Sequence, residues 1–429
     1  MADIDETHDP ARRSWVASAN QAGTDFPIQN LPFGVFSPRA GAPRGGVAIG
    51  DTILDIGAAA SAGLLRGEAT AAASGSTLNA LLALDRSEAR ALRREIGVLL
   101  DAASPPRPDL LHPAADCAIH LPVTVRNYTD FYAGIHHAIA ATSIMRPGTP
   151  PLPPNYKYLP IAYHGRASSV RASGADVRRP RGQRAPDSAQ APTFGPSERL
   201  DLELEMGMFI GAGNAIGEPI PIAEAERHLF GFCLLNDWSA RDIQAWEMAP
   251  LGPFLAKNFS TTISPWIVTA DALAPFRAPA MARDAGDPKP LDYLWADDDQ
   301  RSGGLDIDLT VCFRTHRMRE AGEAAVAVIR SNARYLYWTP AQMLAHHSSG
   351  GCNMLPGDLL GTGTISGPTD DQLSSLLELT RGGQTPFALP NGEQRGFLQD
   401  GDEVSFTGRC QRDGFVSIGF GTCSGCVIP

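Results

Sequence analysis

The chain has 429 residues, 43% hydrophobic and 19% charged, as in an ordinary globular protein with enough sequence for two or three domains. Its formal net charge of −11 and the lack of a basic run argue against a nucleic-acid binder. The acidic N-terminus does not resemble a signal peptide, and no apolar stretch is long enough to cross a bilayer. We therefore expect a cytoplasmic protein without nucleic-acid or membrane partners, and its seven cysteines, an odd number, suit reduced thiols.

The first part of the chain predicts a small, mostly β domain over residues 1–122. An entry strand is expected at 30–37, and a hairpin at 46–55 that turns at Gly50-Asp51. Asp85-Arg-Ser-Glu88 has the spacing of a capping box and precedes apolar residues at helical spacing. A helix is therefore predicted from residue 85 to about residue 100.

The second part, residues 123–429, predicts a larger β domain with few helices, so the fold class is mostly β (α+β). Strand-like runs at 202–210, 305–313, 358–365, 403–408 and 414–419 alternate with glycine and proline. Capping-box spacing at Ser239-Ala-Arg-Asp242 and Thr339-Pro-Ala-Gln342 predicts two short helices. Residues 280–304 are polar and are expected on the surface.

Acidic residues concentrate in one predicted strand. In Asp201-Leu-Glu203-Leu-Glu205-Met the acids alternate with apolar residues, so a strand places all three carboxylates on one face. Crowded like charges repel, which leaves two interpretations: a solvated edge strand, or a divalent cation bound by carboxylate oxygens. Asp130 and Asp237 are further ligand candidates, with a turn acid and a helix-dipole partner as their structural alternatives.

Hydrogen-bond donors form a second group of candidates. Arg241 and Gln244 lie three residues apart on a predicted helix, so both project from the same face, either into solvent or toward an oxyanion. Lys257 follows a turn rich in proline and glycine, where it is either a surface residue or a further functional cation.

A general base could come from one of two histidine pairs, His136-His137 and His346-His347. Imidazole titrates near neutral pH, although most histidines have a structural explanation. Glu378 lies in an apolar run, where an unpaired charge is costly. It is therefore either an acid at a strand edge or the residue that orients such a base.

Six segments of the sequence together resemble the fumarylacetoacetate hydrolase family. They are Asp130-Phe-Tyr-Ala-Gly-Ile-His-His-Ala, Leu159-Pro-Ile-Ala-Tyr-His-Gly-Arg-Ala-Ser-Ser169, Glu203-Leu-Glu205, Asn236-Asp-Trp-Ser-Ala-Arg-Asp-Ile-Gln244, Pro250-Leu-Gly-Pro-Phe-Leu-Ala-Lys257 and Gly363-Thr-Ile-Ser-Gly-Pro368. The resemblance runs from about residue 30 to the C-terminus. It implies a homodimer in which each subunit has a small SH3-like N-terminal barrel and a larger C-terminal mixed β-roll that holds a divalent metal.

The resemblance also implies an activity. The expected reaction is hydrolysis of a carbon–carbon bond in 4-fumarylacetoacetate, a β-diketone with two carboxylates, to fumarate and acetoacetate, the last step of tyrosine and phenylalanine catabolism. The first alternative is a related hydrolase that acts on another β-diketone or on an acylpyruvate. The second is a scaffold that binds calcium and catalyses nothing.

The family's motifs assign roles to individual residues. The resemblance implies Ca²⁺ ligands at Asp130, Glu203, Glu205 and Asp237, and an Mg²⁺ site that involves Asp237, Lys257 and Thr261. His137 takes the position of the general base, Glu378 fixes its tautomer, and the oxyanion is held by Arg241, Gln244 and Lys257. Substrate contacts match Tyr132, Arg146, Tyr163, Gln244 and Thr364. Met248 stands where the family often has a tyrosine, so one hydrogen-bond donor to substrate is missing there.

Overall fold

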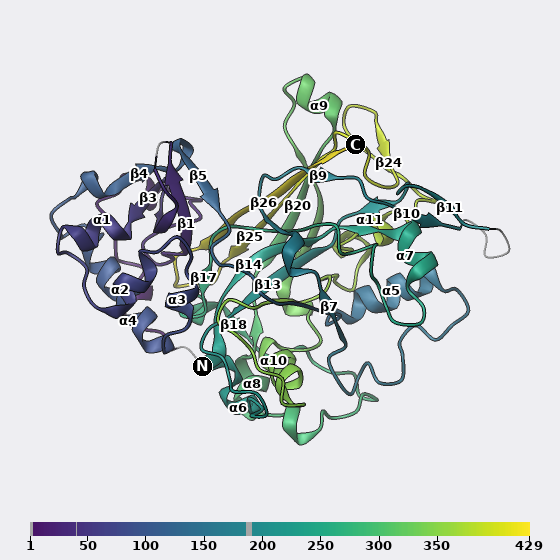
Figure 1. The fold of residues 1–429 in the computed structure, drawn as a ribbon, viewed down its shortest axis with the longest axis horizontal. Coiled ribbons are helices and arrows are strands. Elements are labelled where there is room, and N and C mark those ends of the chain that lie inside the picture. Colours follow the sequence, from purple (N-terminus) through teal and green to yellow (C-terminus); the bar gives the residue numbers. More distant parts are fainter. Residues whose placement is uncertain (1–2, 40, 186–190) are drawn as a thin grey trace.

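The computed structural model describes residues 3–39, 41–185 and 191–429 (Figure 1). The described chain is α+β, and sheets form its centre. Its eleven α-helices are more than the sequence predicted, but most are short, and only α4 (Arg86–Leu99) and α5 (Ile135–Met145) exceed ten residues. Within the described residues, no helix combines the length and the apolar character needed to span a bilayer.

The N-terminal part forms a five-stranded antiparallel sheet, seen in purple and blue at the left of Figure 1. The strand order is β4 (Leu111–Pro113), β3 (Thr52–Asp55), β2 (Arg44–Ile49), β1 (Phe33–Pro38) and β5 (Cys117–His120). The predicted hairpin is confirmed, and Gly50 at its turn has a φ of +58°. Helix α4 is also confirmed, although Asp85 caps it through the amide of Ser87. An SH3-like form of this sheet and a boundary at residue 122 stay predictions.

The C-terminal part is built on two sheets. The larger has eight strands, of which seven follow the order β7 (Ala162–Gly165), β6 (Tyr128–Phe131), β22 (Leu359–Gly361), β13 (Leu204–Ile210), β14 (Leu229–Asp237), β16 (Thr261–Ile263) and β8 (Val170–Ala172), while β17 (Val268–Thr269) pairs with β14. It is mixed, because β22 pairs with β6 and β16 with β8 in parallel. The smaller sheet has the order β21 (Val326–Asn332), β20 (Asp308–Arg314), β25 (Glu403–Cys410), β26 (Ile418–Ile428) and β9 (Val177–Arg178). The strand expected at 414–419 is mostly a turn, since β26 begins at Ile418.

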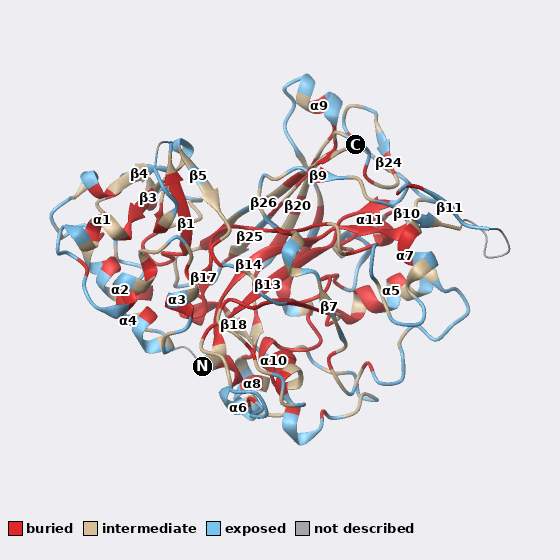
Figure 2. Ribbon diagram, viewed as in Figure 1, coloured by how far each residue is buried: buried red, intermediate tan, exposed pale blue. Residues whose placement is uncertain are grey.

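The core lies against both faces of the larger sheet, whose strands are among the buried segments drawn in red at the centre of Figure 2. On one face Met206 and Met208 of β13 belong to the same buried cluster as Phe406 of the smaller sheet. On the other face Phe209 of β13 shares a cluster with Phe33 of the N-terminal sheet. Every residue of β13 and β14 is therefore buried, including the acids that these strands carry.

The acidic stretch is not a solvated edge strand, so that interpretation is wrong. Asp201 lies in the short strand β12 (Leu200–Asp201), Glu205 lies in β13, and Glu203 lies between them in an isolated bridge with Ser375. Strand β13 pairs with β14 on one side and β22 on the other, so it is interior to the sheet. Asp201, Glu203 and Glu205 are all buried, which requires an electrostatic partner for each carboxylate.

The capping box expected at Ser239 is also wrong. Ser239 belongs to β15 (Ser239–Ala240), which pairs with β12, and its hydroxyl donates to the carbonyl of Asp237. Helix α7 (Arg241–Glu247) begins after Ala240 without a side-chain cap. The Thr339 capping box is confirmed at the start of α10 (Pro340–Ser348). At Ser239, pairing with a strand 38 residues earlier in the sequence therefore overrides the local capping-box pattern. At Thr339 no such pairing among the described residues competes, and the capping-box pattern predicts the helix start correctly.

Candidate active site and metal centre

Three carboxylates from three strands of the larger sheet converge at one point. Asp130 of β6, Glu205 of β13 and Asp237 at the end of β14 each offer an oxygen atom within 4.8 Å of the others, and all three side chains are buried. One oxygen of each carboxylate has no hydrogen-bond partner among the described residues. Unpaired buried carboxylate oxygens are costly, whereas a hard divalent cation binds such oxygens directly. The three residues therefore fit a divalent metal. A solvated acid or a partner of a helix dipole would not explain why three carboxylates are buried together, each with an unpartnered oxygen.

The backbone between these carboxylates has to be glycine. Gly361 of β22 lies between β6 and β13, and a Cβ there would be 2.5 Å from Oδ1 of Asp130 and 3.1 Å from Oε2 of Glu205. The next turn supplies a donor, because the amide of Gly363 donates to Oε2 of Glu205 at 3.0 Å. Tyr163 lies opposite Asp130 on β7, and its hydroxyl is 3.1 Å from Oδ2 of Asp130.

Electrostatics within this cluster favour protons when no cation is present. Burial first, and then the charge of Asp237, raise the pKa of Asp130 well above its usual value. Burial and the charge of Asp130 do the same to the pKa of Glu205. Burial also raises the pKa of Asp237, although Lys257 opposes that shift. A cation would therefore replace protons as it binds.

Glu203 lies beside the cluster rather than in it. Its Oε1 is 2.8 Å from Nη2 of Arg241, and its Oε2 accepts from Nζ of Lys257 at 2.5 Å. Burial acts to raise the pKa of Glu203, but Lys257 and Arg241 outweigh burial and lower that pKa. Both carboxylate oxygens of Glu203 are thus paired with cationic side chains. Glu203 therefore differs from Asp130, Glu205 and Asp237, each of which has one oxygen without a partner among the described residues.

Lys257 is buried, so the surface interpretation of this residue is wrong. Its Nζ lies 2.6 Å from Oδ2 of Asp237 as well as beside Glu203. Burial acts to lower the pKa of Lys257, but the two carboxylates raise it, and a protonated amine has no lone pair for a metal. Thr261 of β16 lies opposite Asp237 in the sheet and is buried. Lys257 therefore acts here as a counter-charge, while Asp237 and Thr261 are the residues of the predicted Mg²⁺ set that carry oxygen atoms.

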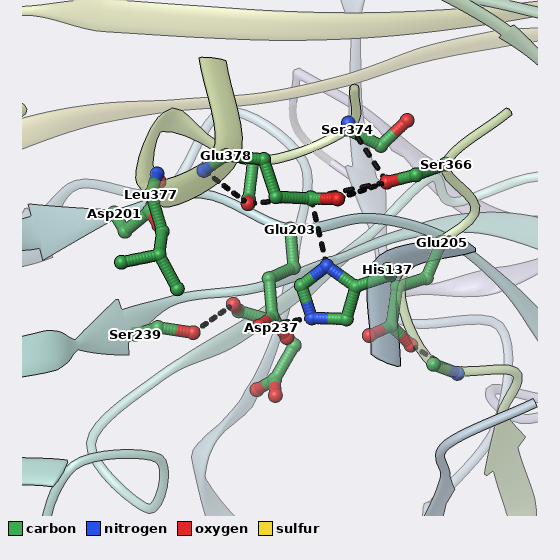
Figure 3. A network of polar contacts seen from close by, with 12 residues as sticks. His137, Asp201, Glu203, Glu205, Asp237, Ser239, Ser366, Ser374, Leu377 and Glu378 are labelled. Atoms are coloured by element: carbon green, nitrogen blue, oxygen red, sulfur yellow. Dashed lines mark hydrogen bonds and ion pairs between the residues drawn. The ribbon is translucent and has the colours of Figure 1, made fainter. Parts of the chain in front are cut away.

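A histidine–carboxylate pair lies beside the cluster (Figure 3). Helix α5, which the sequence did not predict, begins after Gly134 and buries His137. Nδ1 of His137 is 2.7 Å from Oε2 of Glu378, and Nε2 is 3.7 Å from Oε1 of Glu203. Glu378 lies in the four-residue helix α11 (Leu376–Leu379), not at a strand edge.

Serine hydroxyls hold the carboxylate of Glu378. Ser366 donates at 2.9 and 3.0 Å to its two oxygens, and Ser375 donates to Oε2 at 2.7 Å. Burial acts to raise the pKa of Glu378, while His137 and the two hydroxyls lower it below its usual value. An ionised Glu378 can only accept, so Nδ1 of His137 donates and Nε2 carries the lone pair.

A cavity of about 650 Å³ opens beside these groups. Every predicted substrate contact lines it, as do the base and most of the charged residues: Tyr132, Arg146, Tyr163, Gln244, Thr364, His137, Asp130, Glu203, Glu205, Arg241 and Lys257. Asp237, Thr261 and Glu378 lie outside this lining. The Thr364 hydroxyl is buried without a partner among the described residues, and Arg146 is exposed. Met248 also lines the cavity, so the position of the missing donor faces the substrate space.

Sequence reasoning missed both serines that hold Glu378. Ser375 was detectable, because Ser375-Leu-Leu-Glu378 has the spacing of a capping box. Ser366 had no local signal, since its contact to Glu378 depends on how two loops meet. The role of Asp201, which accepts from Arg241, was missed as well.

Comparison with known proteins places this arrangement in a family. "Fumarylacetoacetase N-terminal" matches residues 29–122, and "Fumarylacetoacetate (FAA) hydrolase C-terminal" matches residues 126–428. A fumarylacetoacetase from Oryza sativa subsp. japonica is 46% identical, with 97% of both chains covered. One from Homo sapiens is 46% identical, with 95% of this chain and 97% of that protein covered.

A solved structure shares the fold. The fumarylacetoacetate hydrolase from psychrophilic Exiguobacterium antarcticum superposes with a TM-score of 0.50 at 16% identity, over 93% of this chain and 99% of that one. This likeness concerns the fold alone. On the two family matches and the near full-length relatives, the chain belongs to the fumarylacetoacetate hydrolase family.

Proposed function

We propose that this chain hydrolyses the carbon–carbon bond of 4-fumarylacetoacetate to give fumarate and acetoacetate, the last step of tyrosine and phenylalanine catabolism. Near full-length relatives named fumarylacetoacetase support the reaction. One structural observation supports it most: the same cavity is lined by His137, which pairs with Glu378, and by Asp130 and Glu205 of the carboxylate cluster suited to a dication.

The metal proposal rests on the donor atoms. Asp130, Glu205 and Asp237 would hold the ion through carboxylate oxygens, and hard oxygen donors suit Ca²⁺ or Mg²⁺. Glu203 and Thr261 are the further oxygen donors at its border. When bound, such an ion supplies Lewis-acid polarisation of the substrate's dicarbonyl oxygens.

The proton transfers are assigned to the chain's own residues. Nε2 of His137 accepts a proton from the water that attacks the substrate carbonyl, and Glu378 stabilises the resulting imidazolium. Donors from Arg241, Gln244 and Lys257 stabilise the tetrahedral oxyanion, at roughly 3 kcal/mol of barrier for one such donor. The carbon–carbon bond then breaks, its electron pair leaves with the acetoacetate fragment, and that carbanion takes the proton from His137.

Substrate orientation is assigned to the cavity wall. The exposed guanidinium of Arg146 pairs with a terminal carboxylate, since charge-assisted bonds are stronger than neutral ones. The hydroxyls of Tyr132, Tyr163 and Thr364 supply further hydrogen bonds. Oε1 of Gln244 already accepts from Nη1 of Arg241 at 3.1 Å, so the amide nitrogen of Gln244 is its remaining donor. With a dication bound at the carboxylate cluster, Arg146, Arg241 and Lys257 would make the pocket locally positive, so an acidic protein can bind a dianion there.

The same proposal includes a homodimer in the cytoplasm. Apolar side chains near the cavity are exposed in the single chain, among them Leu251 at 97% and Phe254 at 66%. Exposed apolar groups of this kind favour an interface with a second copy. The seven cysteines are all unpaired, which suits a reducing compartment. Light scattering on a Leu251→Asp, Phe254→Asp variant tests the interface, because it should yield monomers; an unchanged mass would contradict this surface.

Steady-state kinetics on fumarylacetoacetate and on acylpyruvates test the activity itself. We expect a higher kcat/KM for fumarylacetoacetate, and loss of turnover with EDTA that added Ca²⁺ or Mg²⁺ restores. Faster cleavage of acylpyruvates would favour the alternative, a related hydrolase with a different substrate. Met248 is the reason to test it, because it lines the cavity where the family often has a tyrosine. Failure to cleave either substrate in the presence of metal would reject the proposed function.

A further inference from the structure

We propose that Asp201 is a positioning residue that holds the oxyanion donor Arg241 and the helix carrying Glu378 in a fixed relationship. This inference rests on the proposed function for its kinetic consequences. Among the three acids of the predicted strand, Asp201 is the one that has no place among the predicted metal ligands. It is fully buried, so its position is set by its partners rather than by solvent.

The carboxylate of Asp201 accepts hydrogen bonds from two separate elements. Oδ2 accepts from Nε of Arg241 at 2.8 Å, at the first residue of α7. The amides of Leu376 and Leu377, the first two residues of α11, donate to Oδ1 at 2.7 Å and to Oδ2 at 3.0 Å. Figure 3 shows Asp201 and Leu377 beside the turn that carries Glu378. A single side chain thus connects α7 to α11, although 175 residues separate Asp201 from Leu376.

The amides at the start of a helix need outside acceptors, because the helix itself offers them none. Asp201 provides such an acceptor and also fixes the guanidinium plane of Arg241, whose Nη2 then reaches Oε1 of Glu203. Glu378 is two residues from the first of these amides, and its carboxylate sets the orientation of His137. Small displacements of catalytic groups carry large kinetic costs. Asp201 therefore acts on both the proposed oxyanion donor and the support of the proposed base, although it does not line the cavity.

The Asp201→Asn substitution keeps the shape but replaces one acceptor oxygen by an amide donor. In the place of Oδ2 that nitrogen would face both Nε of Arg241 and the amide of Leu377, and in the place of Oδ1 it would face the amide of Leu376. At least one of the two connections is therefore lost. We expect kcat to fall about 10- to 100-fold while KM changes less than threefold. In an Arg241→Gln background the same substitution should lower kcat by a smaller factor, because part of its effect passes through Arg241.

Asp402 provides a matched control. It is also a fully buried acid, it accepts from Nε of Arg395 at 2.8 Å and from the amide of Gln399 at 2.8 Å, and neither it nor Arg395 lines the cavity. Asp402→Asn should lower thermal stability to a similar extent while leaving kcat and KM unchanged. An Asp201→Asn enzyme that folds, binds metal and keeps kcat within twofold of the wild type would overturn the proposal.

A second measurement does not depend on turnover. Hydrogen exchange followed by NMR should show faster exchange at the amides of Leu376 and Leu377 in Asp201→Asn and no change there in Asp402→Asn. Unchanged exchange at both amides contradicts the positioning role. If the wild type fails to cleave fumarylacetoacetate but the two amides lose protection, the proposed function is wrong and the structural connection stands.

Discussion

Nδ1 of His137 lies 2.7 Å from Oε2 of Glu378, and both side chains are buried. The carboxylate fixes which imidazole nitrogen carries the proton and leaves the other one basic. A residue 241 positions away in the sequence therefore determines the tautomer of the proposed base.

Replacement of the base should abolish turnover without loss of metal. His137→Ala removes the proton acceptor, and general-base catalysis contributes about 10²- to 10⁴-fold, so we expect kcat to fall by at least that factor. Calcium binding, measured by isothermal titration calorimetry, should persist because His137 is not one of the three clustered carboxylates. The neighbouring His136→Ala variant is the control. A retained rate in His137→Ala would contradict the assignment of His137 as the general base.

Removal of a hydroxyl from Glu378 should shift the pH profile. Ser366 donates to both oxygens of Glu378. Burial acts to raise the pKa of Glu378, but His137, Ser375 and Ser366 together lower it below its usual value, because they favour the ionised carboxylate. Ser366→Ala should therefore raise the pKa of Glu378, so that the carboxylate that orients His137 takes up a proton at higher pH. We expect the acidic limb of kcat/KM to move to higher pH. Ser374→Ala is the control, since its hydroxyl donates to the carbonyl of Ile365; a limb that stays in place or moves to lower pH would contradict the assignment.

Divalent ions and protons should compete for the carboxylate cluster. Burial and neighbouring charges raise the pKa values of Asp130 and Glu205, so the ion-free site retains protons that a cation must displace. The affinity for Ca²⁺ should therefore fall as the pH is lowered from 8 to 6. Calorimetry in two buffers with different ionisation enthalpies should detect proton release.

Glu205→Gln tests where that binding takes place. It removes one of the three carboxylates, so the stabilisation of thermal unfolding by Ca²⁺ should be largely lost. An affinity that is independent of pH in the wild type, or full Ca²⁺ stabilisation in Glu205→Gln, would argue against this cluster as the metal site.

Met248 should weaken substrate binding relative to a tyrosine. The side chain lines the cavity, and Met248→Tyr restores a hydroxyl at that position. A hydrogen bond to a charged group is worth about 1.5–3 kcal/mol, so we expect KM for fumarylacetoacetate to fall about tenfold. Met248→Phe adds the ring without the hydroxyl and serves as the control. An equal effect of both variants would assign the change to packing.

The segment 280–304 should influence KM from outside the cavity. The carboxylate of Asp287 contacts Nζ of Lys157 and accepts from the hydroxyl of Tyr337 at 3.0 Å. Lys157 follows the proline-rich loop, residues 149–154, that forms one wall of the cavity. Asp287→Asn weakens the contact to Lys157, so the loop should be held less firmly in place. We expect a higher KM with kcat retained, and no effect from the exposed Asp292→Asn. A fall in kcat alone would indicate a different role.

The sequence predicted the chemistry of the site better than its geometry. Resemblance identified His137, Glu378 and the carboxylates, because the motifs that carry them are long and collinear. Hydrophobic alternation predicted β13, β20 and β25, because short strands between turns follow a local pattern. Helix α5 was missed, since its Ile135–Met145 sequence is apolar on most sides and shows no amphipathic period.

Long-range pairing explains the remaining errors. Glu203 and Glu205 are equivalent by alternation, yet only Glu203 meets Lys257, which lies 54 residues away. Ser239 has the pattern of a helix cap, but its pairing with Asp201 makes it part of a strand. No local window contains such contacts, so neither the counter-charges of the site nor the role of Asp201 could be derived from the sequence.

Strand β22 lies between β6 and β13, so the last third of the polypeptide separates two strands from its first half. During synthesis, Asp130 and Glu205 leave the ribosome long before Gly361 and Glu378 do. A nascent or truncated chain therefore contains the acids without the strand that sets their spacing and without the partner of the imidazole. Assembly of the catalytic centre is consequently a late event in folding, because the centre cannot form until the chain has been synthesised beyond Glu378.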